Sequence, residues 1–234
     1  MAIFPPSQSS SLSKTDNVEY QKDEEIKKVE RIYQRNREII STLPNEKGWL
    51  TEHLCLHQGF WFPVYTLEGI MFIQQCFKAQ PTDVLLISTP KSGTVWLKAI
   101  VFAIMNRTYH NNMSVTHPLV TTNPHDCVPF LEIKIFRAPP IGDVEIMPSP
   151  RLLATHIPCT LLPKSVLSSG CKIVYICRNP KDVFVSMWHF MARLTTKELS
   201  CSPLSLEEAF DLFCKGISGY GPFWIMFRSI GKQV

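Results

Sequence analysis

The chain has 234 residues, of which 45% are hydrophobic and 19% are charged. This length and composition predict one globular α/β domain and exclude a disordered chain. The formal net charge of +4 is too small to indicate nucleic acid or an anionic membrane as a partner, and no apolar run is long enough to predict a transmembrane helix. The mild positive charge is compatible with a small anionic ligand.

Eight cysteines are spread along the chain without a Cys-x-x-Cys pair. This pattern favours free, mostly buried thiols over a disulfide framework, and therefore a reducing compartment such as the cytoplasm. The N-terminal segment lacks the basic and apolar regions of a secretory signal. Residues 1–22 are interpreted as a flexible tail.

Hydrophobic periodicity and chain breakers predict an alternation of helices and strands, which is typical of a three-layer α/β domain with a mostly parallel sheet. In chain order, the predicted elements are a helix over residues 23–44, an aromatic and irregular segment over 48–63, a helix over 66–78, a strand over 83–88, a helix over 94–106, loop with a short helix over 107–150, strands over 151–155 and 172–177, and helices over 180–193 and 205–215.

The turn after the first predicted strand has the composition of an anion site. It holds Lys91, Ser92 and Gly93, and the next helix opens at Thr94. The N–H groups and positive dipole end of a helix favour a phosphate or phosphosulfate beside such a lysine. The order differs from the P-loop motif of nucleotide kinases, because Lys91 precedes Gly93. An ordinary strand-to-helix turn is the alternative that these residues leave open.

A second group of polar residues follows the strand over 172–177. Asn179 suits a helix N-cap and Pro180 suits the first helical position. Arg178 then lies at the strand's carboxyl end, with Ser186 two turns along the helix. An arginine fork and a hydroxyl can bind a second phosphate. The alternative is an arginine that pairs with a surface acid and a serine that packs against the sheet.

His156 follows the strand over 151–155 and so reaches the same edge of the sheet. Its near-neutral pKa suits a general base, although a structural or surface histidine is the alternative. Two anion sites at adjacent strand ends match a nucleotide with phosphates at two positions.

These segments together resemble the cytosolic sulfotransferase family, and its plant branch in particular. The matching segments are TPKSGTVW (89–96), ATHIP (154–158) and CRNPKDVFVSMWHF (177–190), with flanking stretches over 41–61 and 209–224. They occur in the order and spacing of that family, and they place the sulfotransferase domain over residues 23–224.

The resemblance implies that 3′-phosphoadenosine 5′-phosphosulfate is the co-substrate and that no metal is required. Residues 91–96 would hold the 5′-phosphosulfate, with Trp96 against the adenine. Arg178 and Ser186 would hold the 3′-phosphate. His156 would take the proton from an acceptor hydroxyl, while Lys91 would stabilise the charge on the leaving oxygen.

The acceptor implied by the resemblance is a small molecule with a hydroxyl group, such as a phenol, flavonoid, steroid or hormone. Phe60, Trp61 and Phe130 are candidates for an apolar acceptor pocket, although a core position is the alternative for each. The sequence makes no prediction about the oligomeric state.

Val95 stands where the family usually has a second threonine. Valine keeps the backbone N–H but lacks the hydroxyl, and losing a hydrogen bond to a charged group costs about 1.5–3 kcal/mol. We therefore expect the affinity for the nucleotide to be roughly tenfold lower, or more.

The family also continues well beyond Trp224, with a further strand, helices and an Arg-Lys-Gly loop. Residues 225–234 do not resemble it, so the fold is expected to be incomplete at the C-terminus. One base added after Trp224 gives a reverse-translated frame that reads like the family, which is the basis for hypothesising a frameshift there. The function hypotheses are therefore an active sulfotransferase, a catalytically inactive remnant that binds nucleotide or an intact relative, and a kinase with a divergent phosphate loop.

Overall fold

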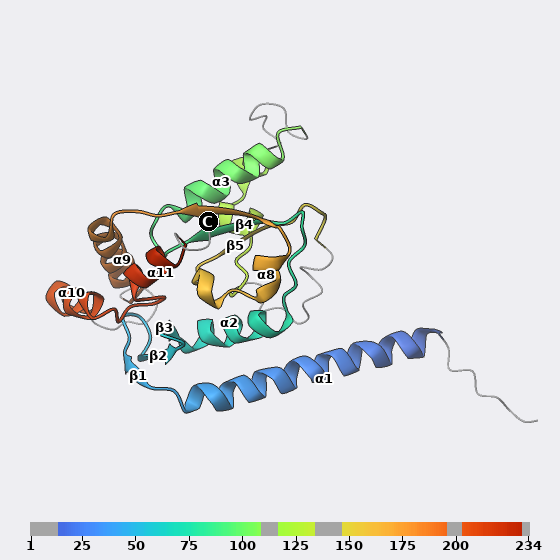
Figure 1. The fold of residues 1–234 in the computed structure, drawn as a ribbon, viewed down its shortest axis with the longest axis horizontal. Coiled ribbons are helices and arrows are strands. Elements are labelled where there is room, and N and C mark those ends of the chain that lie inside the picture. Colours follow the sequence, from blue (N-terminus) through green and yellow to red (C-terminus); the bar gives the residue numbers. More distant parts are fainter. Residues whose placement is uncertain (1–13, 109–116, 134–146, 196–202, 231–234) are drawn as a thin grey trace, which may run out of the picture.

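The computed structural model describes residues 14–108, 117–133, 147–195 and 203–230. Its central sheet has three parallel strands in the order β5–β4–β6, namely Leu152–Thr155, Val84–Ser88 and Lys172–Ile176. Figure 1 shows helix α3 (Thr94–Met105) on one face, and helices α2 (Val64–Cys76) and α8 (Lys164–Ser168) on the other. The predicted three-layer α/β fold with a parallel sheet is confirmed.

The other elements surround this centre. They are α1 (Lys14–Ser41), β1 (Asn45–Lys47), β2 (His53–His57), β3 (Phe60–Pro63), α4 (Pro118–Thr121), α5 (Pro124–Cys127), the 3-10 helix η1 (Cys159–Leu161), α9 (Pro180–Leu194), α10 (Leu206–Cys214) and α11 (Phe223–Ile230).

The two faces of the sheet belong to different hydrophobic cores, because successive side chains along a strand point to opposite faces. Leu85 and Ile87 of β4 pack with the buried residues of α2, whereas Leu86 packs with apolar residues of α3. A third cluster joins α9 and α10 to Phe223 at the start of α11. The packing of Leu86 against α3 holds this helix, which follows β4, against the sheet.

A buried ion pair fixes the amino ends of β4 and β5. The Arg151 Nε atom donates to Asp83 Oδ1 at 2.8 Å, and both side chains are almost fully buried. The guanidinium also donates to the Lys78 carbonyl. Since the two strands begin at one anchored point and pair in register from Val84 with Leu152, their carboxyl ends also lie level.

The segment over residues 48–63, which we predicted to be irregular, instead contributes to a second sheet. Strands β1, β2 and β3 form an antiparallel sheet in that order, and β2 and β3 form a hairpin around Gln58 and Gly59. Both turn residues have positive φ, as the tight hairpin requires. Gln-Gly is not a strong turn signal, so the sequence pattern did not reveal the hairpin.

The small sheet also holds a distant loop in place. Trp61 N donates to the Gly221 carbonyl at 2.7 Å, and Tyr220 N donates to the Trp61 carbonyl at 2.8 Å. This short bridge therefore sets the position of Tyr220, just before α11.

Two other expectations need correction. Helix α1 begins at Lys14, before the predicted start at residue 23, because residues 14–22 contain no glycine or proline to stop it. Residues 1–13 of the predicted tail lie outside the described residues. The described cysteines are free thiols, but only Cys55 and Cys159 are buried, and Cys177 and Cys214 are exposed. Helix α11 spans the position after Trp224, and the expected break in the family pattern at that position stays a prediction.

Candidate functional site

The carboxyl ends of β4, β5 and β6 open into one cavity of about 550 Å³. The cavity collects nearly all of the residues that the sequence predicted for the site. Those that line it are Lys91, Gly93, Thr94, Val95, Trp96, His156, Arg178 and Ser186. Three segments that are far apart in the sequence therefore converge as expected for neighbouring parallel strand ends.

The turn between β4 and α3 leads directly into this cavity. Lys91 and Gly93 both have left-handed backbones, with φ of 66° and 102°, and Gly93 is the N-cap residue of α3. The first turn of the helix, residues 94–97, contains only uncharged side chains. The helix N-terminus thus presents backbone N–H groups and its positive dipole end without a carboxylate to neutralise them.

Ser92 behaves differently from its neighbours in the turn. Its side chain is buried, and its hydroxyl is hydrogen-bonded to the hydroxyl of Thr89. Ser92 N donates to the Thr89 carbonyl at 3.3 Å. The serine therefore closes the turn upon itself and is not among the residues that line the cavity.

His156 is fixed by the end of β4. Its Nδ1 atom lies 2.6 Å from the Ser88 carbonyl oxygen, so Nδ1 carries the proton and donates it. In the neutral ring Nε2 is then the basic nitrogen. Burial lowers the pKa of His156 to about 4, and the nearby Lys98 and His125 act in the same direction. His156 is therefore neutral at physiological pH.

Glu132 accepts a hydrogen bond from the backbone of His156 and is a residue that the sequence analysis missed. Its fully buried carboxylate accepts hydrogen bonds from His156 N at 2.8 Å, Thr155 Oγ1 at 2.9 Å and Tyr220 OH at 3.2 Å. Burial raises the pKa of Glu132, while these donors oppose the rise. The available signal was one acidic residue inside an otherwise apolar run over residues 128–133.

The cavity concentrates positive charge around Lys91. The Lys91 ammonium lies 4.0 Å from the centre of the Phe190 ring on α9. Burial lowers the pKa of Lys91, and the charges of Arg193 and Arg178 lower it further. Because two guanidinium groups lie near enough to lower the pKa of Lys91, an anion would stabilise the charge of this site.

Arg178 also contacts the turn itself. Its Nη1 atom donates to the Lys91 carbonyl at 3.4 Å, and its Nε atom lies 3.6 Å from Asp182 Oδ2. That ion pair is exposed and joins two residues four positions apart in the sequence, so it stabilises the fold by little. Asn179 caps α9 by accepting from Lys181 N, as the sequence predicted. Arg178 and Ser186 therefore both reach the cavity from the segment after β6.

The candidate acceptor aromatics divide between the cavity and the core. Phe130 lines the cavity and lies 4.7 Å from the His156 ring. Phe60 belongs to the main hydrophobic core, and Trp61 makes the bridge to Gly221. Neither Phe60 nor Trp61 is among the lining residues, so the core alternative holds for Phe60.

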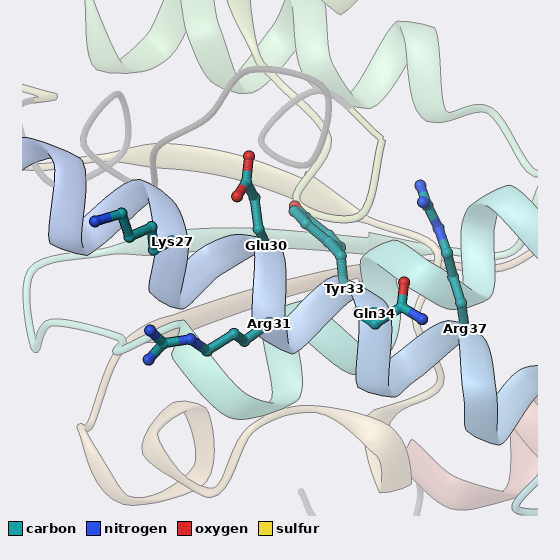
Figure 2. Close-up of a pocket in the computed structure, with 6 residues that line it drawn as sticks. All are labelled: Lys27, Glu30, Arg31, Tyr33, Gln34 and Arg37. Carbon is teal, nitrogen blue, oxygen red and sulfur yellow. The ribbon is translucent and has the colours of Figure 1, made fainter.

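A second hollow, of about 520 Å³, lies along α1 and holds none of the predicted site residues. Figure 2 shows that all of its lining side chains come from this one helix, with Glu30, Tyr33 and Arg37 on one side of it. Arg37 pairs with Glu68 at 2.9 Å, and Tyr33 stacks on Phe72 at 4.9 Å. These contacts attach α1 to α2, and the mixed charges do not converge on a point.

Comparison with known proteins decides the family. Residues 81–232 match the sulfotransferase domain family. The chain belongs to the sulfotransferase family. The matched region contains the turn at Lys91, the strand before His156 and the loop at Arg178. It also includes most of the segment 225–234 for which we found no resemblance.

The similar proteins include plant cytosolic sulfotransferases. The chain is 48% identical to cytosolic sulfotransferase 12 of Arabidopsis thaliana over 83% of its own length and 59% of that relative's length. For cytosolic sulfotransferase 15 of the same plant, the values are 45%, 80% and 52%. The chain thus spans somewhat more than half the length of these relatives. No helix in the described part of the chain is long and apolar enough to cross a membrane.

Solved structures agree with this assignment. A putative steroid sulphotransferase from Arabidopsis thaliana matches with a TM-score of 0.72 and 43% identity, over 94% of this chain and 69% of that one. Mouse sulfotransferase SULT7A1, complexed with PAP, matches with a TM-score of 0.56 and 26% identity over 76% of this chain and 57% of that one. The family and fold of the chain therefore rest on both sequence and structure.

Proposed function

We propose that the protein transfers a sulfuryl group from 3′-phosphoadenosine 5′-phosphosulfate to the hydroxyl of a small organic acceptor. The observation that carries this proposal is the pairing, in one cavity, of a neutral histidine with a lysine beside a helix N-terminus. Family membership supports the same reaction type.

The phosphosulfate end of the co-substrate fits the turn before α3. Lys91 would contribute a positive charge and Gly93 a close backbone approach, while Thr94 would add a hydroxyl at the start of the helix. The Trp96 side chain is 75% exposed although it lines the cavity. A large exposed indole at this place is suited to stack against the adenine.

The 3′-phosphate fits the segment after β6. Arg178 can offer a planar fork of N–H donors just before α9, and Ser186 can offer a hydroxyl from the second turn of that helix. Arg193 adds a charge near Lys91, which favours an anionic ligand in the same region. Two phosphate-binding groups on separate strand ends match the two phosphate positions of the co-substrate.

His156 would act as the general base. Its Nε2 atom would take the proton of the acceptor hydroxyl while the acceptor oxygen forms a bond to sulfur. The bond between sulfur and the bridging phosphate oxygen breaks in the same step, and Lys91 would stabilise the charge left on that oxygen. The acceptor, the co-substrate and these two side chains account for every proton and electron pair.

The acceptor is proposed to be a phenol, flavonoid, steroid or hormone-like molecule. Apolar side chains line the cavity that contains His156, among them Phe130, Ile133 and Met187. Such walls favour a compact apolar body with one reactive hydroxyl. The related proteins are named cytosolic, which supports the cytoplasm as the location of this one.

Transfer of radiolabelled sulfate from the co-substrate to a panel of phenols, flavonoids and steroids tests the proposal. We expect label on at least one acceptor, and loss of that label in the His156→Phe variant. His189→Phe is the matched control, because His189 is exposed on α9 and is not among the lining residues. Calorimetric binding of the nucleotide without any label transfer would favour a nucleotide-binding remnant instead.

A further inference from the structure

Phe190 is a large apolar side chain to which the proposed reaction assigns no role. It lies on α9, is 38% exposed and lines the cavity together with Ser186. In the described part of the chain, none of the three hydrophobic clusters includes it. Packing in a core therefore does not account for the position of this ring.

The Phe190 ring lies against the Lys91 ammonium. The Nζ atom is 4.0 Å from the ring centre, and the face of a phenyl ring attracts a cation. Among the residues that the structure describes, no ion pair joins Lys91 to a carboxylate. Burial and the neighbouring charges of Arg193 and Arg178 lower the pKa of Lys91. Phe190 thus favours the ammonium form in surroundings that disfavour it.

The segment that contains Phe190 also holds the backbone of Lys91. Arg178, just before α9, donates from Nη1 to the Lys91 carbonyl oxygen at 3.4 Å. Ser186 and Phe190 are four residues apart on α9, so they lie on one face of the helix, and both line the cavity. The carbonyl and the ammonium of Lys91 are therefore both contacted from the segment that would bind the 3′-phosphate.

We propose that Phe190 is a positioning residue, which holds the Lys91 ammonium through the face of its ring at the place where charge develops on the leaving oxygen. The inference rests on the proposed sulfotransferase function. An ammonium has three N–H donors, so a ring on one side of it leaves donors for the oxygen on the other side. The contact would persist while the bond to sulfur breaks, so it should stabilise the transition state and raise kcat.

Phenylalanine analogues with fluorine on the ring, introduced in place of Phe190, test the proposal. Fluorine withdraws electron density from the ring face and weakens its attraction for a cation, while the size and apolar character of the side chain change little. We expect kcat for the transfer of radiolabelled sulfate to a phenol to fall stepwise through the monofluoro, trifluoro and pentafluoro analogues. The total decrease should be about two- to fivefold, the effect of one cation–π contact at a partly exposed site. An unchanged or higher kcat in the pentafluoro chain overturns the inference.

Phe184 offers a matched control on the same helix. Its ring contacts Trp49 and Phe213 in a hydrophobic cluster, and Phe184 is not among the residues that line the cavity. The pentafluoro analogue in place of Phe184 makes the same chemical change to α9 but should leave kcat unaltered. An equal decrease in kcat at both positions would show that fluorination disturbs the helix as a whole, and would contradict the proposed role of Phe190.

The pKa of Lys91 gives a second readout that needs neither substrate nor turnover. Nitrogen-15 spectra of the lysine ammonium groups across pH measure this pKa, and the Lys91→Met variant identifies the signal. Because the ring favours the charged form, the pentafluoro analogue in place of Phe190 should lower the pKa of Lys91, with proton binding about two- to fivefold weaker.

The same pKa distinguishes the proposal from two other outcomes. If Phe190 serves only as a wall for the acceptor, its fluorination changes KM for the acceptor and leaves the pKa of Lys91 unaltered, which overturns the inference. Failure of the proposed function looks different: the pKa of Lys91 still falls in the pentafluoro chain, but no variant transfers label to any acceptor.

Discussion

His156 Nδ1 lies 2.6 Å from the carbonyl oxygen of Ser88, so the last residue of β4 holds the imidazole that follows β5. The same Ser88 also contacts Thr94 through its hydroxyl, at 2.8 Å. One residue at the end of the central strand therefore positions both the candidate base and the start of the helix that would bind the phosphosulfate. Ser88 therefore sets the distance between the candidate base and the candidate anion site.

Replacing His156 by phenylalanine should abolish most transfer without changing nucleotide binding. Phenylalanine preserves a ring against Phe130 and Tyr220 but has no basic nitrogen. Loss of a general base lowers the rate by about 10²–10⁴-fold. Transfer of radiolabelled sulfate measures the rate, and calorimetry measures nucleotide affinity in the same preparation. A variant that retains a tenth of the activity would show that His156 is not the base.

The loss of activity at acid pH should occur at a lower pH than it would with a histidine base of ordinary pKa. Burial lowers the pKa of His156 to about 4, compared with the ordinary 6.5. The basic form thus persists as the pH falls from neutrality, and kcat/KM for the nucleotide should fall with a midpoint near 4. Initial rates across buffers test this, with circular dichroism to monitor folding. A midpoint near 6.5 contradicts it.

The same shift makes a prediction about stability. The folded-state pKa of His156 lies below its unfolded value, so protons bind preferentially to the unfolded chain. The contribution of His156 to the free energy of unfolding is complete above about pH 6.5. It is lost as the pH falls from about 6.5 toward 4. Urea unfolding across these pH values should show a smaller acid-side loss for His156→Phe than for the wild-type chain.

Two substitutions at Lys91 distinguish the role of its charge from the role of its backbone conformation. Lys91 has φ of 66°, a left-handed conformation that glycine adopts more easily than alanine. Both Lys91→Gly and Lys91→Ala should lose nucleotide affinity, but the glycine variant should be more stable by about 0.5–1 kcal/mol. Thermal unfolding provides the comparison. Equal stabilities would mean that the turn relaxes to another backbone conformation.

Val95→Thr should strengthen nucleotide binding. Val95 lies in the first turn of α3 and lines the cavity, and threonine keeps its shape while adding a hydroxyl. A hydrogen bond to a charged group contributes about 1.5–3 kcal/mol, which corresponds to roughly tenfold or more in affinity. Calorimetry with the desulfated nucleotide measures the gain. Val95→Ala is the control for changed volume, and a threonine variant no tighter than wild type refutes the assignment.

Glu132→Gln should destabilise the fold by about 1–3 kcal/mol, because a buried amide introduces donors where three donors already point. The carboxylate accepts from His156 N, Thr155 and Tyr220. Tyr220→Phe removes only one of these bonds and should cost less, about 0.5–1.5 kcal/mol. Chemical denaturation gives both values. Equal costs for the two variants would show that the bond from Tyr220 alone accounts for the stability that the carboxylate contributes.

The parts of the fold that were predictable are specified by short runs of neighbouring residues. The run Val-Leu-Leu-Ile-Ser followed by Pro90 and Gly93 specifies a buried strand, a turn and a helix without reference to the rest of the chain. Asn179 and Pro180 likewise mark the start of α9. The hairpin at Gln58 could not be read in this way, because its stability comes from pairing with other segments.

Prediction of the candidate site from the sequence had similar limits. His156 and Lys91 were predictable because strand ends in a parallel sheet meet at one edge. The direction of the Ser92 hydroxyl toward Thr89 depends on the local turn geometry, which residue type alone does not specify. Glu132 and Phe190 were not identified, because each acts through contacts with residues far away in the sequence.

The double contact made by Ser88 also restricts how this turn can vary in length. Its carbonyl oxygen fixes His156 and its hydroxyl fixes Thr94, so the five residues between Ser88 and Thr94 must span a set distance. Side chains within the turn can be exchanged while this spacing is kept. An inserted or deleted residue would instead move the helix start relative to the imidazole, so the turn should tolerate substitution but not a change in length.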